Sequence, residues 1–261
     1  HGAAVRATDL KPEPGVLQTL EQLGVPFTAQ SDEVFRGAYF DLATAYEDLK
    51  QHDKAIAVLT QARSLSPTDP AVAIRLARAQ ANGGKGDNAL ATLQAAAAKF
   101  PDESSLQLEL ASTLERQKKY ADAEGLFRKM IAADPADANA LNSFGYMLAE
   151  RGQKLDESVS LVQRALTLDP GNPAYLDSLG WAYYKQNKFD LAEPPLREAA
   201  EKLPTISVIQ SHLGDVLNKR GLYQEAIDAW QRAIDGDGDS VTRSDLDDRI
   251  KSARQKIGKK N

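Results

Sequence analysis

Residues that could carry catalytic or metal chemistry are few in this chain and lie far apart. The histidines are His1, His52 and His212, and there is no cysteine. His212 has a carboxylate, Asp215, one helical turn further on, and a zinc site needs more ligands than this pair. No H-E-x-x-H motif and no cysteine nucleophile are present. We therefore predict a protein that is not an enzyme and uses no metal and no cofactor. We expect His212 to be exposed.

Two polar stretches are similar in composition to ligand-binding loops but lack the required spacing. Residues 82–86 combine three glycines with Lys85, yet the phosphate-loop spacing G-x-x-x-x-G-K-[ST] is absent. Aspartates alternate with glycines over residues 235–239, but Ser240 and Leu246 stand where a calcium loop of the EF-hand type has glycine and glutamate. Both stretches are predicted to be turns.

A period of about 34 residues organises the chain. Prolines recur with gaps of 34, 34, 35 and 34 residues, at Pro67, Pro101, Pro135, Pro170 and Pro204. Three further positions repeat with them. The first position holds the small residues Ala43, Ala77, Ala111, Gly145, Gly180 and Gly214. The second holds Ala55, Ala89, Ala123, Ser158, Ala192 and Ala226. The third, four residues after the second, holds the bulky residues Leu59, Leu93, Phe127, Val162, Leu196 and Trp230. Such a period predicts an array of helical hairpins, each with one apolar face.

The repeat resembles the tetratricopeptide repeat, with its signature W-x2-L-G-x2-Y…A-x3-F…P. In residues 173–204, Leu176 stands in the tryptophan position and Leu196 in the phenylalanine position. The resemblance implies an all-α fold, a right-handed α-solenoid of helix-turn-helix units. The predicted units are 36–69, 70–103, 104–137, 138–172, 173–206 and 207–240, preceded by an N-terminal segment (1–35) and followed by a capping helix with a basic tail (241–261).

Several local features accompany this pattern. We expect a short helix near residues 15–23, helix caps at Ser31-Asp32 and Ser244, and one extra residue in the turn at 151–156. Pro194-Pro195 predicts a late start or a kink in the second helix of its unit. In the last helix, we expect a solvated basic face and an apolar stripe made of Leu246, Ile250, Ala253 and Ile257.

Composition limits the partners. The net charge is −5 and no basic stripe is visible, so nucleic acid is not expected as a ligand. No apolar run approaches the length of a membrane span. His1-Gly2 does not resemble a native start, so we expect a fragment that a signal or lipid anchor could precede. The absence of cysteine suits the cytosol and the bacterial periplasm equally.

The resemblance implies that the first helix of each hairpin lines a concave groove. Amides and a carboxylate beside aromatic rings suit an extended peptide, because the amides can bond its backbone while the rings supply apolar contact. The alternative is that the rings pack against neighbouring helices. The basic pattern of the arrays that grip chaperone tails is missing. The predicted groove residues are Asn139, Asn142, Tyr146, Asp177, Trp181, Tyr184, Lys185, Asp215 and Asn218.

These features predict a non-enzymatic scaffold or adaptor that binds a peptide or protein segment. Residues 139–146 and 175–181 also look like bacterial cell-envelope tetratricopeptide proteins, some of which are outer-membrane lipoproteins that deliver substrates to a periplasmic protease. That likeness implies an adaptor for a protease or an assembly, periplasmic or outer-membrane-associated, with the cytoplasm as the alternative. The alternative function is a self-assembling scaffold whose ends stack through segment 16–27 and the basic last helix.

Overall fold

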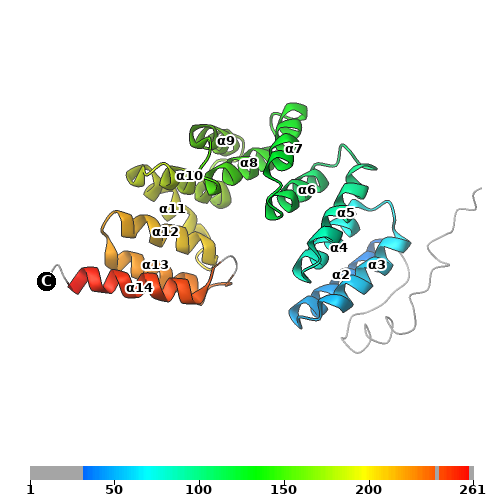
Figure 1. Cartoon of the computed structure of the whole chain (residues 1–261), viewed down its shortest axis with the longest axis horizontal. Coiled ribbons are helices and arrows are strands. Elements are labelled where there is room, and N and C mark those ends of the chain that lie inside the picture. Colours follow the sequence, from blue (N-terminus) through cyan, green and yellow to red (C-terminus); the bar gives the residue numbers. More distant parts are fainter. Residues whose placement is uncertain (1–31, 239–240, 259–261) are drawn as a thin grey trace, which may run out of the picture. The chain divides into compact units, whose positions relative to one another are not determined.

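The computed structural model describes residues 32–238 and 241–258 (Figure 1). Within these ranges the chain contains α-helices and turns and no strand, which confirms the all-α prediction. The predicted helix near residues 15–23 and the cap at Ser31 lie outside the described residues. No described helix combines the length and the apolar character that crossing a membrane requires.

In the sequence the described helices follow one another as six consecutive pairs and one last helix, joined by short turns. Their bounds are α2 (Asp32–Asp48), α3 (His52–Leu65), α4 (Pro70–Asn82), α5 (Gly86–Ala97), α6 (Ser104–Arg116), α7 (Tyr120–Ala133), α8 (Ala138–Glu150), α9 (Leu155–Leu168), α10 (Pro173–Lys185), α11 (Phe189–Lys202), α12 (Ser207–Lys219), α13 (Tyr223–Asp235) and α14 (Arg243–Gly258). The chain divides into two compact units between Leu126 and Phe127, inside α7.

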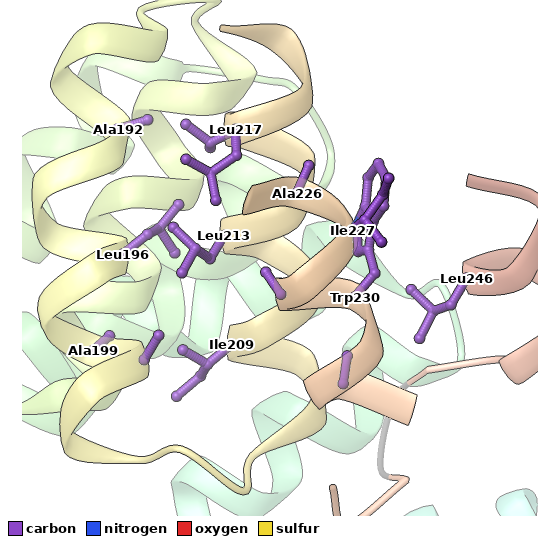
Figure 2. Packing of buried hydrophobic residues seen from close by; sticks show 14 of the residues in the cluster. Ala192, Leu196, Ala199, Ile209, Leu213, Leu217, Ala226, Ile227, Trp230 and Leu246 are labelled. Carbon is purple, nitrogen blue, oxygen red and sulfur yellow. The ribbon is translucent and has the colours of Figure 1, made fainter. Parts of the chain in front are cut away.

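The core of the second unit is a row of apolar side chains that runs through successive helices. Figure 2 shows Leu196 of α11, Leu213 of α12, and Trp230 of α13, with Leu246 of α14 next in line. All four are buried. Burying such a side chain contributes about 1.5–3 kcal/mol, so each helix is held mainly by its neighbours in the row. The first unit has a similar cluster around Tyr39, Leu42, Leu59 and Leu76.

Glycine recurs where the first helix of a pair approaches the second most closely. A Cβ atom placed on Gly180 would lie 2.4 Å from Leu196 Cγ and 2.9 Å from the backbone oxygen of Ala192. Gly145 and Gly214 meet their own second helices in the same way. The small residue in the repeat therefore permits close packing of α8 on α9, α10 on α11, and α12 on α13.

Gly180→Ala should lower the free energy of unfolding by about 1–3 kcal/mol, because the new methyl group overpacks the contact with Leu196. Gly125→Ala in α7 is the matched control, since no atom lies within 4 Å of its added Cβ. There the gain in helix propensity should raise stability by about 0.5–1 kcal/mol. Urea unfolding followed by circular dichroism measures both changes. Equal stabilisation by the two variants would contradict the packing role of Gly180.

The connections agree with the predicted turns. Residues 83–85 join α4 to α5, and Gly84 adopts a φ of +74°. Four residues, 151–154, join α8 to α9, while three join α10 to α11. The extra residue is confirmed, and it is accommodated by left-handed conformations at Gly152 and Lys154.

The predicted late start of the helix that holds Pro194-Pro195 is wrong. Helix α11 begins at Phe189 and continues through both prolines to Lys202. The prolines deprive only the backbone oxygens of Asp190 and Leu191 of helical partners, and these two residues are exposed, so water can replace the lost donors. Burial of Ala192 and Leu196 holds the helix on its neighbours.

The start of the last helix also differs from the prediction. Helix α14 begins at Arg243, and the backbone N–H groups of Asp245 and Leu246 donate to the backbone oxygen of Thr242. Ser244 therefore lies inside the first turn and is not the cap. The apolar stripe is confirmed: Leu246, Ile250 and Ala253 are buried, and Ile257 packs against the same core.

The aspartate-rich turn after α13 closes on the beginning of α12. The backbone N–H of Ser207 donates to Asp237 Oδ1 at 3.1 Å, and the N–H of Asp237 donates to the backbone oxygen of Thr205. The Asp237 carboxylate thereby satisfies an N–H group that the first turn of α12 leaves free. Across residues 32–238 and 241–258, His, Asp and Glu side chains form no group of three or more placed to hold a metal ion.

Candidate peptide-binding site

The predicted groove residues all lie on the first helices of three successive pairs in the second unit. Helix α10 contacts α8 on one side and α12 on the other. Asn139, Asn142 and Tyr146 belong to α8, the set from Asp177 to Lys185 belongs to α10, and Asp215 and Asn218 belong to α12. Their structural surroundings differ widely.

The two asparagines of α8 have different roles. Asn139 Oδ1 accepts a hydrogen bond from the hydroxyl of Tyr175 at 2.8 Å, so it joins α8 to α10. Burial raises the pKa of Tyr175, with added effects from the Asp169 and Asp137 carboxylates, which favours the protonated hydroxyl that donates this bond. Asn142 Oδ1 is buried and accepts no hydrogen bond from the described residues.

The aromatic rings form a stack in which Trp181 is central. Trp181 is 8% exposed and lies between His212, at 3.9 Å between ring centroids, and Tyr184, at 4.7 Å. The two interplanar angles are 15° and 6°. Tyr146 is half-buried, with its ring centroid 6.5 Å from that of His212. Trp181 therefore packs against a neighbouring helix, as the alternative prediction for the rings stated, whereas Tyr146 and Tyr184 keep part of their surface exposed.

Glu150, which the sequence analysis did not single out, holds the edge of this stack. The indole Nε1 of Trp181 donates to Glu150 Oε1, and Lys185 Nζ donates to the Glu150 backbone oxygen at 3.3 Å. Lys185 also lies 4.8 Å from the centroid of the Trp181 ring, in a cation–π contact. Glu150 and Lys185 are 35 residues apart, which matches the spacing of Gly145 and Gly180. This repeat spacing is the feature of the sequence that could have predicted the contact of Glu150 with Lys185.

The prediction that His212 is exposed is wrong. Its side chain is buried, and Nδ1 lies 2.9 Å from Asp177 Oδ1 on the preceding first helix. Asp215, the carboxylate nearest in sequence, bonds other residues. The His212 ring lies on the face of α12 that meets α10, where Trp181 covers it. Its Nδ1 therefore needs a hydrogen-bond partner on α10.

Asp215 joins α12 to the two helices that follow it. It accepts from Trp230 Nε1 at 3.1 Å and from Arg249 Nη1 at 2.8 and 2.9 Å. Burial raises the pKa of the Asp215 carboxyl, while the nearby Arg249 and His212 oppose that rise. The basic face of α14 is solvated as predicted, since Arg249 and Lys256 are exposed. From this face Arg249 binds Asp215 and Lys256 donates to Asn218 Oδ1 at 3.1 Å.

An open pocket of about 470 Å³ lies where these helices meet. It falls within the size range of ligand pockets and has both aromatic and polar walls. Asp177, Trp181 and the three predicted residues of α8 are not among its walls. The lining residues are Tyr184, Asp215, Asn218, Trp230, Asp248, Arg249 and Ser252.

Comparison with known proteins places the repeats in a family. Two sequence profiles of the tetratricopeptide repeat match overlapping parts of the chain. One matches residues 46–112 and 84–144, and the other matches 120–173, 147–205 and 178–241. Among curated proteins, the TPR repeat-containing protein PA4667 of Pseudomonas aeruginosa is 35% identical over 165 residues, which is 62% of this chain and 28% of that protein. Human tetratricopeptide repeat protein 7A is 27% identical over 49% of this chain and 15% of its own length.

Solved structures show the same fold. A tetratricopeptide repeat protein from Parabacteroides merdae superposes with a TM-score of 0.70 at 12% identity, over 96% of this chain and 100% of that one. The Cut9–Hcn1 hetero-tetramer of the APC/C contains a chain with a TM-score of 0.66 at 18% identity, over 84% of this chain and 42% of that one. The chain spans less than a third of the length of the two curated relatives above. It belongs to the tetratricopeptide repeat family and has the all-α solenoid fold of that family.

Proposed function

We propose that this chain is a non-enzymatic adaptor that holds a segment of a partner protein on α8, α10, α12 and α14. Tetratricopeptide repeats are protein–protein interaction scaffolds, and the proposal adds where the partner binds. The open pocket lined by Tyr184, Asp215 and Asn218 carries this assignment, because predicted groove residues converge there with α14.

The chemistry of this surface suits an extended segment. The half-buried Asn142 offers a carboxamide on α8, and Asn218 adds a second one at the pocket. The half-buried ring of Tyr184 supplies apolar contact area at low entropic cost. Trp181 is buried and does not offer its own surface to the partner, but it supports the ring of Tyr184 by stacking on it.

We further propose a bacterial cell envelope as the place of action, in the periplasm or at the outer membrane, with delivery of a substrate to a protease or an assembly as the role. The likeness of residues 139–146 and 175–181 to envelope adaptors supports this setting, and the similarity to a Pseudomonas aeruginosa protein fits it. Fractionation of native cells, with detection of the endogenous protein, tests the compartment. Recovery in the cytosolic fraction alone would reject it.

A photo-crosslinking residue placed at Asn142 or Asn218 should capture the partner in native cells, whereas the same residue at Thr167 should not. Thr167 is exposed on α9, a second helix, and serves as the matched control. Asn142→Ala combined with Asn218→Ala should then weaken binding of the captured partner roughly tenfold, at about 0.5–1.5 kcal/mol per lost hydrogen bond.

The crosslinking result also separates the two functions. A product with the mass of two copies of this chain would support the self-assembling scaffold in place of the adaptor. Equal capture from Asn142 and Thr167, or no capture from any position, would remove the site from these helices.

A further inference from the structure

A second charged surface lies in the first unit, on the first helices of its hairpins. Helix α4 contacts both α2 and α6. Arg75 and Arg78 are one turn apart on α4, so they point to the same side of that helix. Arg116 and Glu109 are seven residues apart on α6 and also share a face. We call Arg75, Arg78 and Arg116 the arginine site.

Two of these arginines share one carboxylate. Arg78 donates to Glu109 Oε2 through Nε at 2.7 Å and lies 2.6 Å from it through Nη2. Arg116 Nη2 donates to Glu109 Oε1 at 3.2 Å and to Thr113 Oγ1 at 2.8 Å. Glu109 is 7% exposed at its side chain, whereas the side chains of Arg78 and Arg116 are 56% and 55% exposed. One arginine would neutralise the buried carboxylate, so the pair carries a surplus positive charge with unused N–H donors that water can reach.

Arg75 adds a cation that forms no ion pair with an acidic side chain of the described residues. Its Nη2 donates to Thr44 Oγ1 at 2.6 Å and to the Phe40 backbone oxygen at 3.3 Å. The guanidinium also lies 5.3 Å from the centroid of the Phe40 ring. These contacts hold the cation in place without neutralising it, and α4 contains no acidic residue at all.

The acidic residues nearby limit the extent of this positive surface. Glu47 and Asp48 lie at the end of α2, and Glu47 accepts a bond from Asn82 of α4 at 3.4 Å. The surplus charge is therefore confined to the neighbourhood of α4 and α6. A ligand must place its negative groups there and keep them away from the end of α2.

We propose that the arginine site binds carboxylate side chains of an acidic protein segment. Guanidinium groups pair with carboxylates in a planar, often bidentate arrangement, and the apolar ring of Phe40 lies beside the cations for an adjacent side chain. Glu109 acts as an internal competitor for the same donors. This site is separate from the pocket of the second unit, so either can fail without the other.

The test uses a fluorescein-labelled tetraglutamate peptide, with tetraglutamine as the neutral control, and fluorescence anisotropy at low ionic strength. Wild type should bind tetraglutamate in preference to tetraglutamine. Glu109→Gln should strengthen binding about three- to tenfold, because both arginines are released toward the ligand. Arg75→Gln should weaken it roughly threefold, as expected for an exposed charge pair.

Two further variants keep the test decisive. Arg78→Gln with Glu109→Gln and Arg116→Gln neutralises the cluster without leaving a buried unpaired charge, and should abolish the preference for tetraglutamate. Arg63→Gln with Lys99→Gln, in α3 and just after α5 and therefore outside the arginine site, should have no effect. Circular dichroism verifies that each variant is folded.

Three outcomes would overturn the proposal. Unchanged or weaker binding by Glu109→Gln would show that the arginines serve only to satisfy Glu109. Loss of binding in the Arg63/Lys99 control equal to that in Arg75→Gln would show a non-specific charge effect. Stronger binding to phosphatidylglycerol vesicles than to tetraglutamate would point to a lipid surface in place of an acidic protein segment.

Discussion

Trp230→Ala should lower the free energy of unfolding by about 3–5 kcal/mol, the usual cost of removing a large aromatic side chain from a core. Trp230 is 1% exposed, and Figure 2 shows its ring at the level of Ile227, with Leu246 of α14 beyond. Its Nε1 also bonds Asp215 at 3.1 Å. The variant therefore loses core packing and leaves the half-buried Asp215 carboxylate with one donor fewer.

Urea unfolding measures this loss, and hydrogen exchange locates it. Because each helix of a repeat array depends on its neighbours, amide protection should fall first in α12, α13 and α14. Trp230→Phe should cost less, since it keeps a buried aromatic ring and loses only the Nε1 donor and part of the indole volume. Leu191→Ala is the apolar control, because Leu191 is 52% exposed and should change stability by no more than about 0.5 kcal/mol. A loss in Trp230→Ala as small as that in Leu191→Ala would contradict the assigned packing.

Trp181→Ala should also destabilise the second unit, by about 3 kcal/mol or more. The indole stacks on His212 and Tyr184 and donates to Glu150, so its removal opens a cavity between α10 and α12. Trp181→Phe should recover most of the stability, because a ring still fills the stack. Any loss of partner binding in Trp181→Ala would then follow from disorder around Tyr184.

Asn142→Ala separates this packing role from binding. Its Oδ1 makes no hydrogen bond with the described residues, so the substitution should leave stability unchanged or slightly raised. Thermal unfolding of the two variants, measured side by side, checks the contrast. If Trp181→Ala is as stable as wild type, the ring contributes little to the fold. Trp181 would then again be a candidate for direct contact with the partner.

Much of the fold is predictable because its signals are local. Residues three and four apart share a helix face, so the apolar spacing of Leu176 and Leu179 is enough to predict α10. The recurrence of Gly145, Gly180 and Gly214 indicates where a second helix must approach closely, and the structure shows that contact. The late helix start predicted from Pro194-Pro195 is wrong, because burial of Ala192 and Leu196 outweighs two missing hydrogen bonds on an exposed turn.

The site was less predictable because its contacts join helices that are far apart in the sequence. By itself the sequence determined the helical hairpins, their period and the helices on which the groove residues lie, since these depend on neighbours within one turn. Only the tertiary structure decided that His212 pairs with Asp177, that Glu150 accepts a hydrogen bond from Trp181, and that Arg249 forms an ion pair with Asp215. Such polar pairs depend on how neighbouring helices cross and on which groups lose water there, and a buried group takes whatever partner that crossing brings within reach.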